Sequence, residues 1–132
     1  ALGCTGGRQD LRRGSFVNAP DLRYTILARY TQPLSAASQV YGQLDFRWQD
    51  EVQFAYDQDP RFIQQAYGIA DFKLGASTAG GRYAVSAFVR NAFDKQYVSN
   101  VIGQGPAGGS AIVNAIPRDF HRYVGVELAV RF

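Results

Sequence analysis

The sequence is poor in the residues that build disulfides and metal centres. Among its 132 residues it has one cysteine, Cys4, and one histidine, His121. A lone cysteine cannot form an internal disulfide, and a lone histidine with no cysteine or carboxylate at ligand spacing argues against a transition-metal site. We therefore expect no metal and no cofactor, and we interpret Cys4 as incidental.

Long apolar runs and a strong net charge are also missing. No run approaches the ~18 apolar residues of a membrane-spanning helix. The 14 basic and 11 acidic residues leave a net charge of +3, which is too mild to predict nucleic-acid binding. With 46% hydrophobic and 19% charged residues, the composition excludes a disordered chain. A soluble β-rich domain or a β-barrel remains.

Methionine is absent and the chain begins at Ala1. We therefore expect a mature or truncated piece of a longer protein, with one domain over residues 1–132. The opening residues do not form the charged, apolar and small-residue series of a signal peptide, so an export signal would lie upstream.

What the sequence has in abundance is alternation of polar and apolar residues. It is clearest over residues 43–54, where only Asp50 breaks the pattern. Residues at spacing two share one side of a strand, so this segment is predicted to be a strand with two unlike faces. The polar set is Gln43, Asp45, Arg47, Gln49, Glu51 and Gln53, and the apolar set is Leu44, Phe46, Trp48, Val52 and Phe54.

Four further segments alternate in the same way: residues 22–30, 67–77, 83–98 and 124–132. A register slip near Asn91 predicts a bulge there. We expect about five strands in an antiparallel, strongly twisted sheet, with almost no helix. Their expected length of roughly 10 to 15 residues exceeds the ~5 to 6 of soluble sheets and covers the ~9 to 11 that cross a bilayer at a tilt.

The predicted connections alternate in length. Short turns are expected at residues 32–38 and 78–81, and long loops at about residues 55–65 and 99–117. Short turns on one rim and long loops on the other are typical of outer-membrane barrels. Tyr and Trp recur near the predicted strand ends, as in barrel girdles, although cross-strand pairing in a soluble sheet explains them equally well.

No motif predicts catalysis. Gly103, Gly105 and Gly108 have the spacing of a dinucleotide-binding loop, but no strand and helix are indicated around them, so we interpret this segment as a flexible loop. Asp57 and Asp59 could help to bind a hard cation, although carboxylates in an exposed turn are more often solvated. The nucleophile elbow, phosphate-binding loop and metalloprotease motifs are all missing, so we expect the protein not to be an enzyme.

Three segments, in this order, resemble the C-terminal end of TonB-dependent outer-membrane receptors. They are Asn18-Ala19-Pro20 with a following strand that ends Tyr30-Thr31-Gln32-Pro33-Leu34, then Arg90-Asn91-Ala92-Phe93-Asp94-Lys95-Gln96-Tyr97, and finally Pro117-Arg118 with Val124-Gly125-Val126-Glu127-Leu128 and the closing Arg131-Phe132. Two features depart from the family's pattern. Ala92 stands where the family usually has Leu, and the spacing from Arg118 to Gly125 is a few residues longer.

The resemblance implies antiparallel transmembrane β-barrel strands, about the last five of some 22 around an N-terminal plug, with long extracellular loops and short periplasmic turns. It implies the bacterial cell outer membrane and energised, TonB-coupled uptake of a scarce nutrient such as an iron-siderophore complex. Because this chain carries neither the plug nor the energy-coupling box, we expect it not to transport anything by itself. The residues implied to face the barrel lumen are Arg23, Arg29, Asp45, Arg47, Asp71, Lys73 and Glu127.

The partners that the resemblance implies are outer-membrane lipid, the TonB energy-coupling complex through the plug, the nutrient ligand and the barrel-assembly machinery. The row Val126, Leu128, Val130 and Phe132 resembles the C-terminal signal that this machinery recognises. A bare strand edge suits recognition by strand addition, whereas a place in the periplasmic aromatic girdle would explain Phe132 equally well.

Two other classes of protein are alternatives. A passive outer-membrane channel or a small complete barrel would need ~8 strands of ~10 residues, which almost fit in this chain. A soluble β-sandwich would need shorter strands with evenly spaced turns. The count of about five long segments argues against both. The transported substrate and its contacts are not indicated by the sequence.

Overall fold

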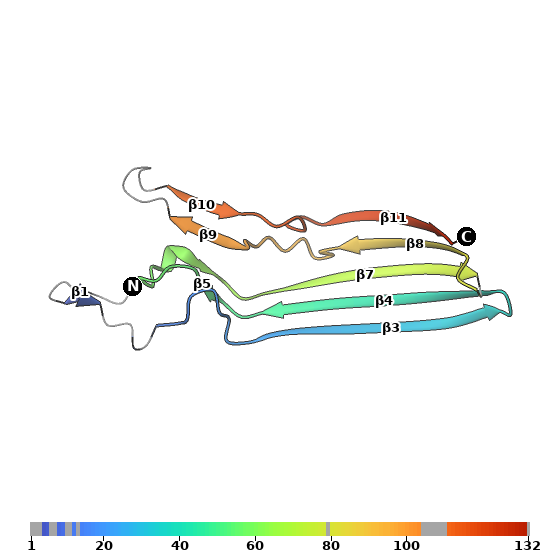
Figure 1. Cartoon of the computed structure of the whole chain (residues 1–132), viewed down its shortest axis with the longest axis horizontal. Helices are drawn as coiled ribbons and strands as arrows, with labels where there is room; N and C mark the ends of the chain where they lie inside the picture. The colour runs from blue at the N-terminus through green and yellow to red at the C-terminus, as the bar shows by residue number, and fades with distance from the viewer. Residues whose placement is uncertain are drawn as a thin grey trace. The chain divides into compact units, whose positions relative to one another are not determined.

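A computed structural model of the chain describes residues 4–5, 8–9, 12, 14–78, 80–103 and 111–131. Apart from the 3₁₀ turn η1 (Pro60–Phe62), every regular element in these ranges is a β-strand (Figure 1). The strands are β1 (Cys4–Thr5), β2 (Arg8–Gln9), β3 (Arg23–Ser35), β4 (Ser38–Gln49), β5 (Val52–Gln53), β6 (Ile63–Gln64), β7 (Tyr67–Thr78), β8 (Tyr83–Arg90), β9 (Asn100–Gly103), β10 (Ile112–Ala115) and β11 (Tyr123–Val130). The all-β prediction is confirmed. The described residues contain no helix that is long and apolar enough to cross a membrane.

The chain divides into two compact units. The strand unit comprises Tyr24–Arg47, Gly68–Lys95 and His121–Phe132. The loop unit comprises Ala1–Arg23, Trp48–Tyr67 and Gln96–Phe120. Each unit is described separately below.

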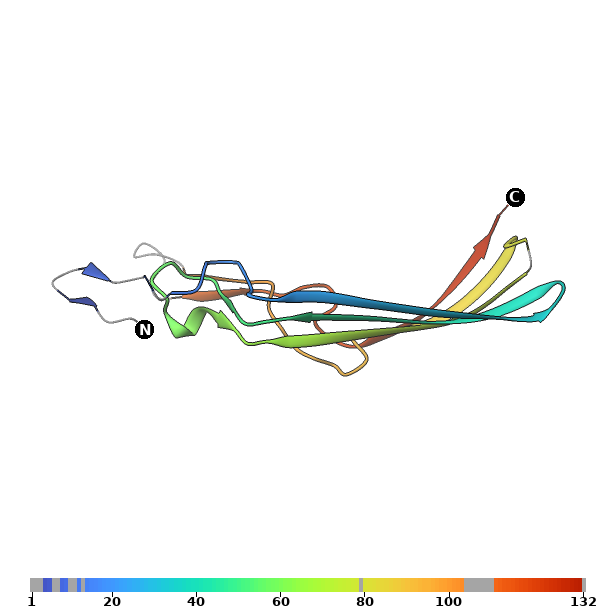
Figure 2. The same cartoon turned by 90° about the horizontal axis from the view of Figure 1, so that it is seen from below.

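The largest sheet has five strands in the order β11-β8-β7-β4-β3 (Figure 1). Strand β8 pairs antiparallel with both β7 and β11, so that Phe88 lies opposite Lys73 on one side and Gly125 on the other. The sheet twists along its strands (Figure 2). The predicted antiparallel sheet of about five strands is therefore confirmed. Strands β3, β4 and β7 have 13, 12 and 12 residues, whereas β8 and β11 have only 8 each, fewer than expected.

The two faces of this sheet differ sharply in composition. On one face, here called the apolar face, the large side chains are mostly exposed, including Leu74 at 69% and Leu128 at 77%. The apolar face comprises Tyr24, Ile26, Tyr30, Leu34, Phe72, Leu74, Tyr83, Val85, Val124, Val126, Leu128 and Val130. The opposite face, here called the polar face, carries the charged residues. The alternation in sequence therefore correctly predicted which residues share a side.

Two aromatic rings on the polar face lie against glycines of neighbouring strands. The ring of Tyr41 would be 2.6 Å from a Cβ atom built on Gly75, and the ring of Phe88 would be 2.4 Å from one on Gly125. Any side chain at these two glycines would displace a ring. The glycines thus let the rings lie flat on the sheet, close to the charged residues.

The predicted bulge near Asn91 is wrong. Strand β8 ends at Arg90, and Asn91 has a left-handed backbone with φ of 48°, which turns the chain out of the sheet. The predicted strand over residues 83–98 therefore stops early. A short polar side chain makes Asn one of the few residues that adopt this conformation readily.

Two other predicted boundaries also shift. Strand β3 runs through Pro33 to Ser35, so the turn expected at residues 32–38 is reduced to Ala36 and Ala37. Proline is tolerated there because β3 is an edge strand of this sheet. Asp50, the exception to the alternation, follows the end of β4, and its N–H donates to the carbonyl of Leu22 at 2.9 Å.

Each segment expected to be a long loop forms part of a short hairpin. Strand β5 pairs with β6, and β9 pairs with β10, each antiparallel. Gly103 ends β9, and Phe62 occupies the space beside it, since a Cβ atom at Gly103 would lie 2.9 Å from that ring. The other two glycines of the dinucleotide-like spacing, Gly105 and Gly108, lie outside the described residues.

Candidate functional site

Six of the seven residues predicted to face the lumen lie in the strand unit, where hydrogen bonds and ion pairs link them across the polar face. Lys73 Nζ is 2.7 Å from Glu127 Oε2, joining β7 to β11. Arg29 Nη1 donates to Gln43 Oε1 at 3.3 Å, and Gln43 Nε2 donates to Asp45 Oδ2 at 2.8 Å. The seventh residue, Arg23, belongs to the loop unit and bonds to Gln49. That this face lines a lumen stays a prediction.

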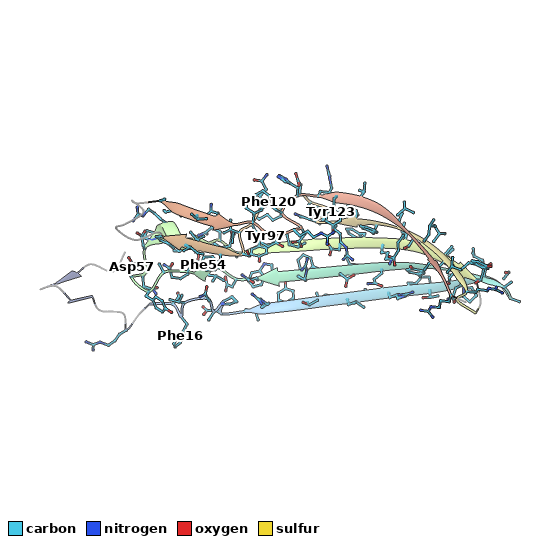
Figure 3. The ribbon with its side chains drawn as sticks, turned by 45° about the horizontal axis from the view of Figure 1, so that its top comes forward. Phe16, Phe54, Asp57, Tyr97, Phe120 and Tyr123 are labelled. Carbon is cyan, nitrogen blue, oxygen red and sulfur yellow. The ribbon has the colours of Figure 1, made fainter. Side chains whose placement is uncertain are left out.

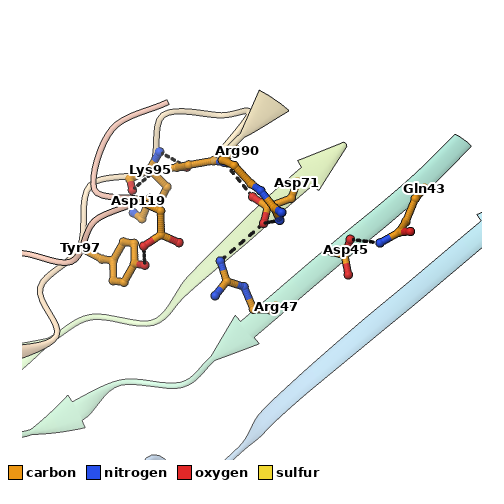
Figure 4. Close-up of polar contacts among 9 residues, drawn as sticks. Gln43, Asp45, Arg47, Asp71, Arg90, Lys95, Tyr97 and Asp119 are labelled. Atoms are coloured by element: carbon orange, nitrogen blue, oxygen red, sulfur yellow. Dashed lines mark hydrogen bonds and ion pairs between the residues drawn. The ribbon is translucent and has the colours of Figure 1, made fainter. Parts of the chain in front are cut away.

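Asp71 on β7 is the centre of the polar face. Its Oδ2 atom is 2.8 Å from Arg90 Nη1 and 3.7 Å from Arg47 Nη2, so two guanidinium groups converge on one carboxylate (Figure 4). Its Oδ1 atom accepts the backbone N–H of Asn91 at 2.8 Å. The Asp71 side chain is only 7% exposed, and burial of a charge is tolerated when it is paired and hydrogen-bonded in this way.

Arg90 was missed as a member of this site. The alternation places Arg90 with Ser86, opposite the apolar set Tyr83, Val85, Ala87 and Val89, although Arg90 is not among the residues predicted to face the lumen. The fold supplies what the pattern lacked, because Arg90 ends β8 directly beside Asp71 on the neighbouring strand.

The turn after β8 is built around Asn91, which is fully buried. Its Oδ1 atom accepts the N–H of Lys95 at 2.8 Å, and its Nδ2 atom donates to the carbonyl of Lys95 at 2.9 Å. The N–H of Ala92 donates to the carbonyl of Ala70 on β7 at 2.8 Å. Residues 91–95 therefore form a hydrogen-bonded turn that is tied to β7 within the strand unit.

Asp94 connects the same turn to the start of β11. Its Oδ1 atom accepts the backbone N–H of Arg122 at 2.7 Å and lies 3.5 Å from His121 Nδ1. The hydrogen bond from Arg122 is the main reason why the pKa of Asp94 is lowered, and His121 contributes further. The carboxylate form is thus favoured in the folded protein.

This geometry predicts a pH dependence. A carboxyl whose pKa is lowered on folding adds stability above its unfolded pKa and loses that contribution as the pH falls through its folded pKa. The comparison uses a His121→Gln background, which removes the neighbouring imidazole. In that background, the protein with Asp94→Asn is expected to be less stable at about pH 6 than the protein that retains Asp94. The difference should begin to shrink as the pH falls below the ordinary aspartate pKa of about 4, and it should vanish once the carboxyl is protonated in the folded protein as well. Urea unfolding at several pH values measures it, and a constant difference would contradict the prediction.

In the loop unit, glutamine side chains hydrogen-bond to neighbouring backbone segments. Gln58 accepts the N–H of Ser15 and donates to the Ser15 carbonyl, both at 3.0 Å, as a neighbouring strand would. Gln64 Oε1 accepts the N–H of Val98 at 2.8 Å. Gln53 is buried and bonds to Ala55. These glutamine side chains therefore hold backbone segments of the loop unit together.

Tyr97, the last residue of the family-like segment, anchors the core of the loop unit. It stacks on Tyr67 with ring centroids 4.4 Å apart, and its hydroxyl lies 2.5 Å from Asp119 Oδ1. Tyr97 lies on the segment between β8 and β9 (Figure 3). Phe16, by contrast, is 85% exposed in the same unit.

The possible cation site at Asp57 and Asp59 has a simpler explanation. Asp59 caps η1 by accepting the N–H of Arg61 at 2.9 Å, and its Oδ2 atom is 2.5 Å from Arg61 Nη2. The hydrogen bonds from Arg61 lower the pKa of Asp59 to about 2. Asp57 Oδ1 accepts the N–H of Asp59 at 3.2 Å. Within the described ranges no three His, Cys, Asp or Glu residues are placed to hold a metal ion.

The residues predicted to form an assembly signal lie on an edge strand. Val126, Leu128 and Val130 are exposed on β11, which pairs only with β8 in its sheet. Phe132 lies outside the described residues. Their role as a signal stays a prediction.

Comparisons with protein-family models, with curated proteins and with solved structures found no match to this chain. The class of this protein is therefore described from the fold of its described residues alone. They form an all-β protein whose main antiparallel sheet has a mutually paired polar face and an exposed apolar face.

Proposed function

We propose that this chain is the C-terminal part of the β-barrel of a TonB-dependent outer-membrane receptor. In this proposal the five-stranded sheet lies in the bacterial outer membrane with its apolar face against lipid and its polar face toward the lumen. The complete receptor takes up a scarce nutrient, such as an iron-siderophore complex, with energy from the TonB complex.

The exposed apolar face is the observation that carries the proposal. Large side chains from four strands stand in solvent together, among them Val124 at 76%, Leu74 at 69% and Tyr30 at 70%. Soluble monomers rarely expose an apolar surface that continues across a whole sheet, because its hydration is unfavourable. Lipid removes that cost, and barrels of the outer membrane alternate apolar residues outward with polar residues inward.

The polar face supports the same orientation. Its carboxylates are engaged by Arg47, Arg90, Lys73 and the Gln43 amide rather than isolated. A water-filled barrel interior tolerates such charges, whereas the hydrocarbon side does not. The long strands β3, β4 and β7 have enough residues to span a bilayer at a tilt.

Topology provides a direct test. The proposal puts Tyr56, which is 80% exposed in the loop unit, outside the cell, and Gly80, with open space around it, at the periplasmic turns. In intact bacteria that make the full-length receptor with Cys4→Ser, a membrane-impermeant maleimide is expected to label Tyr56→Cys and not Gly80→Cys. Both variants should react after the membrane is opened. Labelling of Gly80→Cys alone in intact cells would invert the topology, and labelling of neither in any membrane fraction would refute the location.

A further inference from the structure

The strand unit has a rim whose charge the proposed function does not explain. The two short turns and the end of β11 meet there, and we call this region the turn rim. It comprises residues 35–38, 78, 80–83 and 129–131. Its charged side chains are Arg82 and Arg131, and no acidic side chain is found among these residues.

The fold brings the two arginines together. Because β8 and β11 are antiparallel, the start of one lies beside the end of the other, and the N–H of Arg131 donates to the carbonyl of Arg82 at 2.9 Å. A Cβ atom on Gly81, in the same turn, would lie 4.0 Å from Arg131 Nη1. Both arginines are exposed. The two arginine residues therefore lie side by side at the ends of neighbouring strands, and the described residues of the rim contain no carboxylate to balance them.

Arg82 also lies near an aromatic ring of the apolar face. Its guanidinium carbon is 5.5 Å from the ring centroid of Tyr83. Tyr83 lies opposite Val130 in the sheet and so belongs to the apolar face. The positive charge thus sits at the boundary between the apolar surface and the solvent, where arginine and tyrosine commonly meet lipid headgroups.

A depression in the sheet surface begins at this boundary. It has a volume of about 440 Å³ and is lined mainly by Ala76, Thr78, Tyr83, Val85, Leu128 and Val130. Its walls are largely apolar, and Tyr83, which follows Arg82 in the chain, is one of the residues that line it. An elongated apolar group with an anionic head matches this arrangement of charge and surface.

We propose that the turn rim binds an anionic phospholipid, with Arg82 and Arg131 contacting the phosphodiester and the depression receiving an acyl chain. The proposal rests on the proposed function, because the lipid reaches this rim from the membrane that covers the apolar face. In that orientation the lipid belongs to the periplasmic leaflet.

The test measures association of the chain with vesicles of phosphatidylcholine, with and without phosphatidylglycerol. Trp48 is the only tryptophan, so its fluorescence reports the partition coefficient. Each arginine near an anionic surface strengthens binding about fivefold, so Arg82→Gln with Arg131→Gln should weaken partition into the anionic vesicles about 25-fold. Partition into phosphatidylcholine alone should not change.

Matched variants separate a specific site from general charge. Arg118→Gln removes an exposed arginine of the loop unit and should leave the preference for phosphatidylglycerol intact. Arg82→Lys with Arg131→Lys keeps both charges and should retain most of it. Circular dichroism confirms that each variant keeps its strands. An equal loss in Arg118→Gln and in the double glutamine variant would overturn the proposal.

The two proposals fail in different ways. If the unmodified chain associates with neither vesicle type, membrane placement itself fails. If it associates with both types equally well, the lipid site fails and membrane placement stands.

Discussion

Leu74→Arg is expected to prevent most of the protein from inserting stably into a lipid bilayer. Leu74 lies near the middle of β7, is 69% exposed, and sits on the apolar face with Phe72. An arginine facing lipid near the bilayer midplane costs about 2 to 4 kcal/mol. The measurement is the folded fraction of the full-length receptor in vesicles, followed by heat-modifiable gel mobility and by urea titration.

Two controls isolate the effect of placing charge in lipid. Leu74→Ala shortens the side chain but stays apolar, and Lys73→Gln changes a charge on the opposite face, where Lys73 pairs with Glu127. Both should insert far better than Leu74→Arg. A soluble β-sandwich would respond differently, because an arginine at an exposed surface position usually changes stability by less than ~0.5 kcal/mol. Normal insertion of Leu74→Arg would therefore refute the assignment of this face to lipid.

Asn91→Ala is expected to destabilise the strand unit by about 2 to 4 kcal/mol, since buried polar groups are left without partners and a left-handed backbone is strained without Asn or Gly. The substitution removes both hydrogen bonds to the backbone of Lys95. It also places alanine, which adopts a left-handed backbone less readily than Asn or Gly, at φ of 48°. Equilibrium unfolding of the full-length receptor in urea measures the loss.

Two further variants divide the contributions of Asn91. Asn91→Gly tolerates the left-handed backbone but has no side chain, so it should lie between the wild type and Asn91→Ala. Asn114→Ala is the matched control, because Asn114 is exposed on β10. It should unfold at the same urea concentration as the wild type. If Asn91→Ala unfolded at the same urea concentration as that control, the hydrogen bonds of Asn91 would not stabilise the turn.

The sequence by itself determined that the protein is all-β and which residues share each face of the main sheet. Side chains alternate across any extended strand whatever its neighbours, so the spacing of Asp45 and Arg47, or of Asp71 and Lys73, was enough to put each pair on one side. Glycine and small residues near positions 36 and 80 similarly marked the turns, because turn conformation is a local property.

Only the tertiary structure decided which strands and side chains meet. The pairing of Lys73 with Glu127 depends on the registers of β7 with β8 and of β8 with β11, and no local pattern specifies those registers. The short hairpins of the loop unit escaped notice because strands of two or four residues have no detectable period. The slip in alternation at Asn91 marks the end of β8, and local spacing could not reveal the hydrogen bond of Asn91 to Asp71 on the neighbouring strand. Arg82 and Arg131, far apart in sequence, form one cationic rim because antiparallel pairing places the start of β8 beside the end of β11.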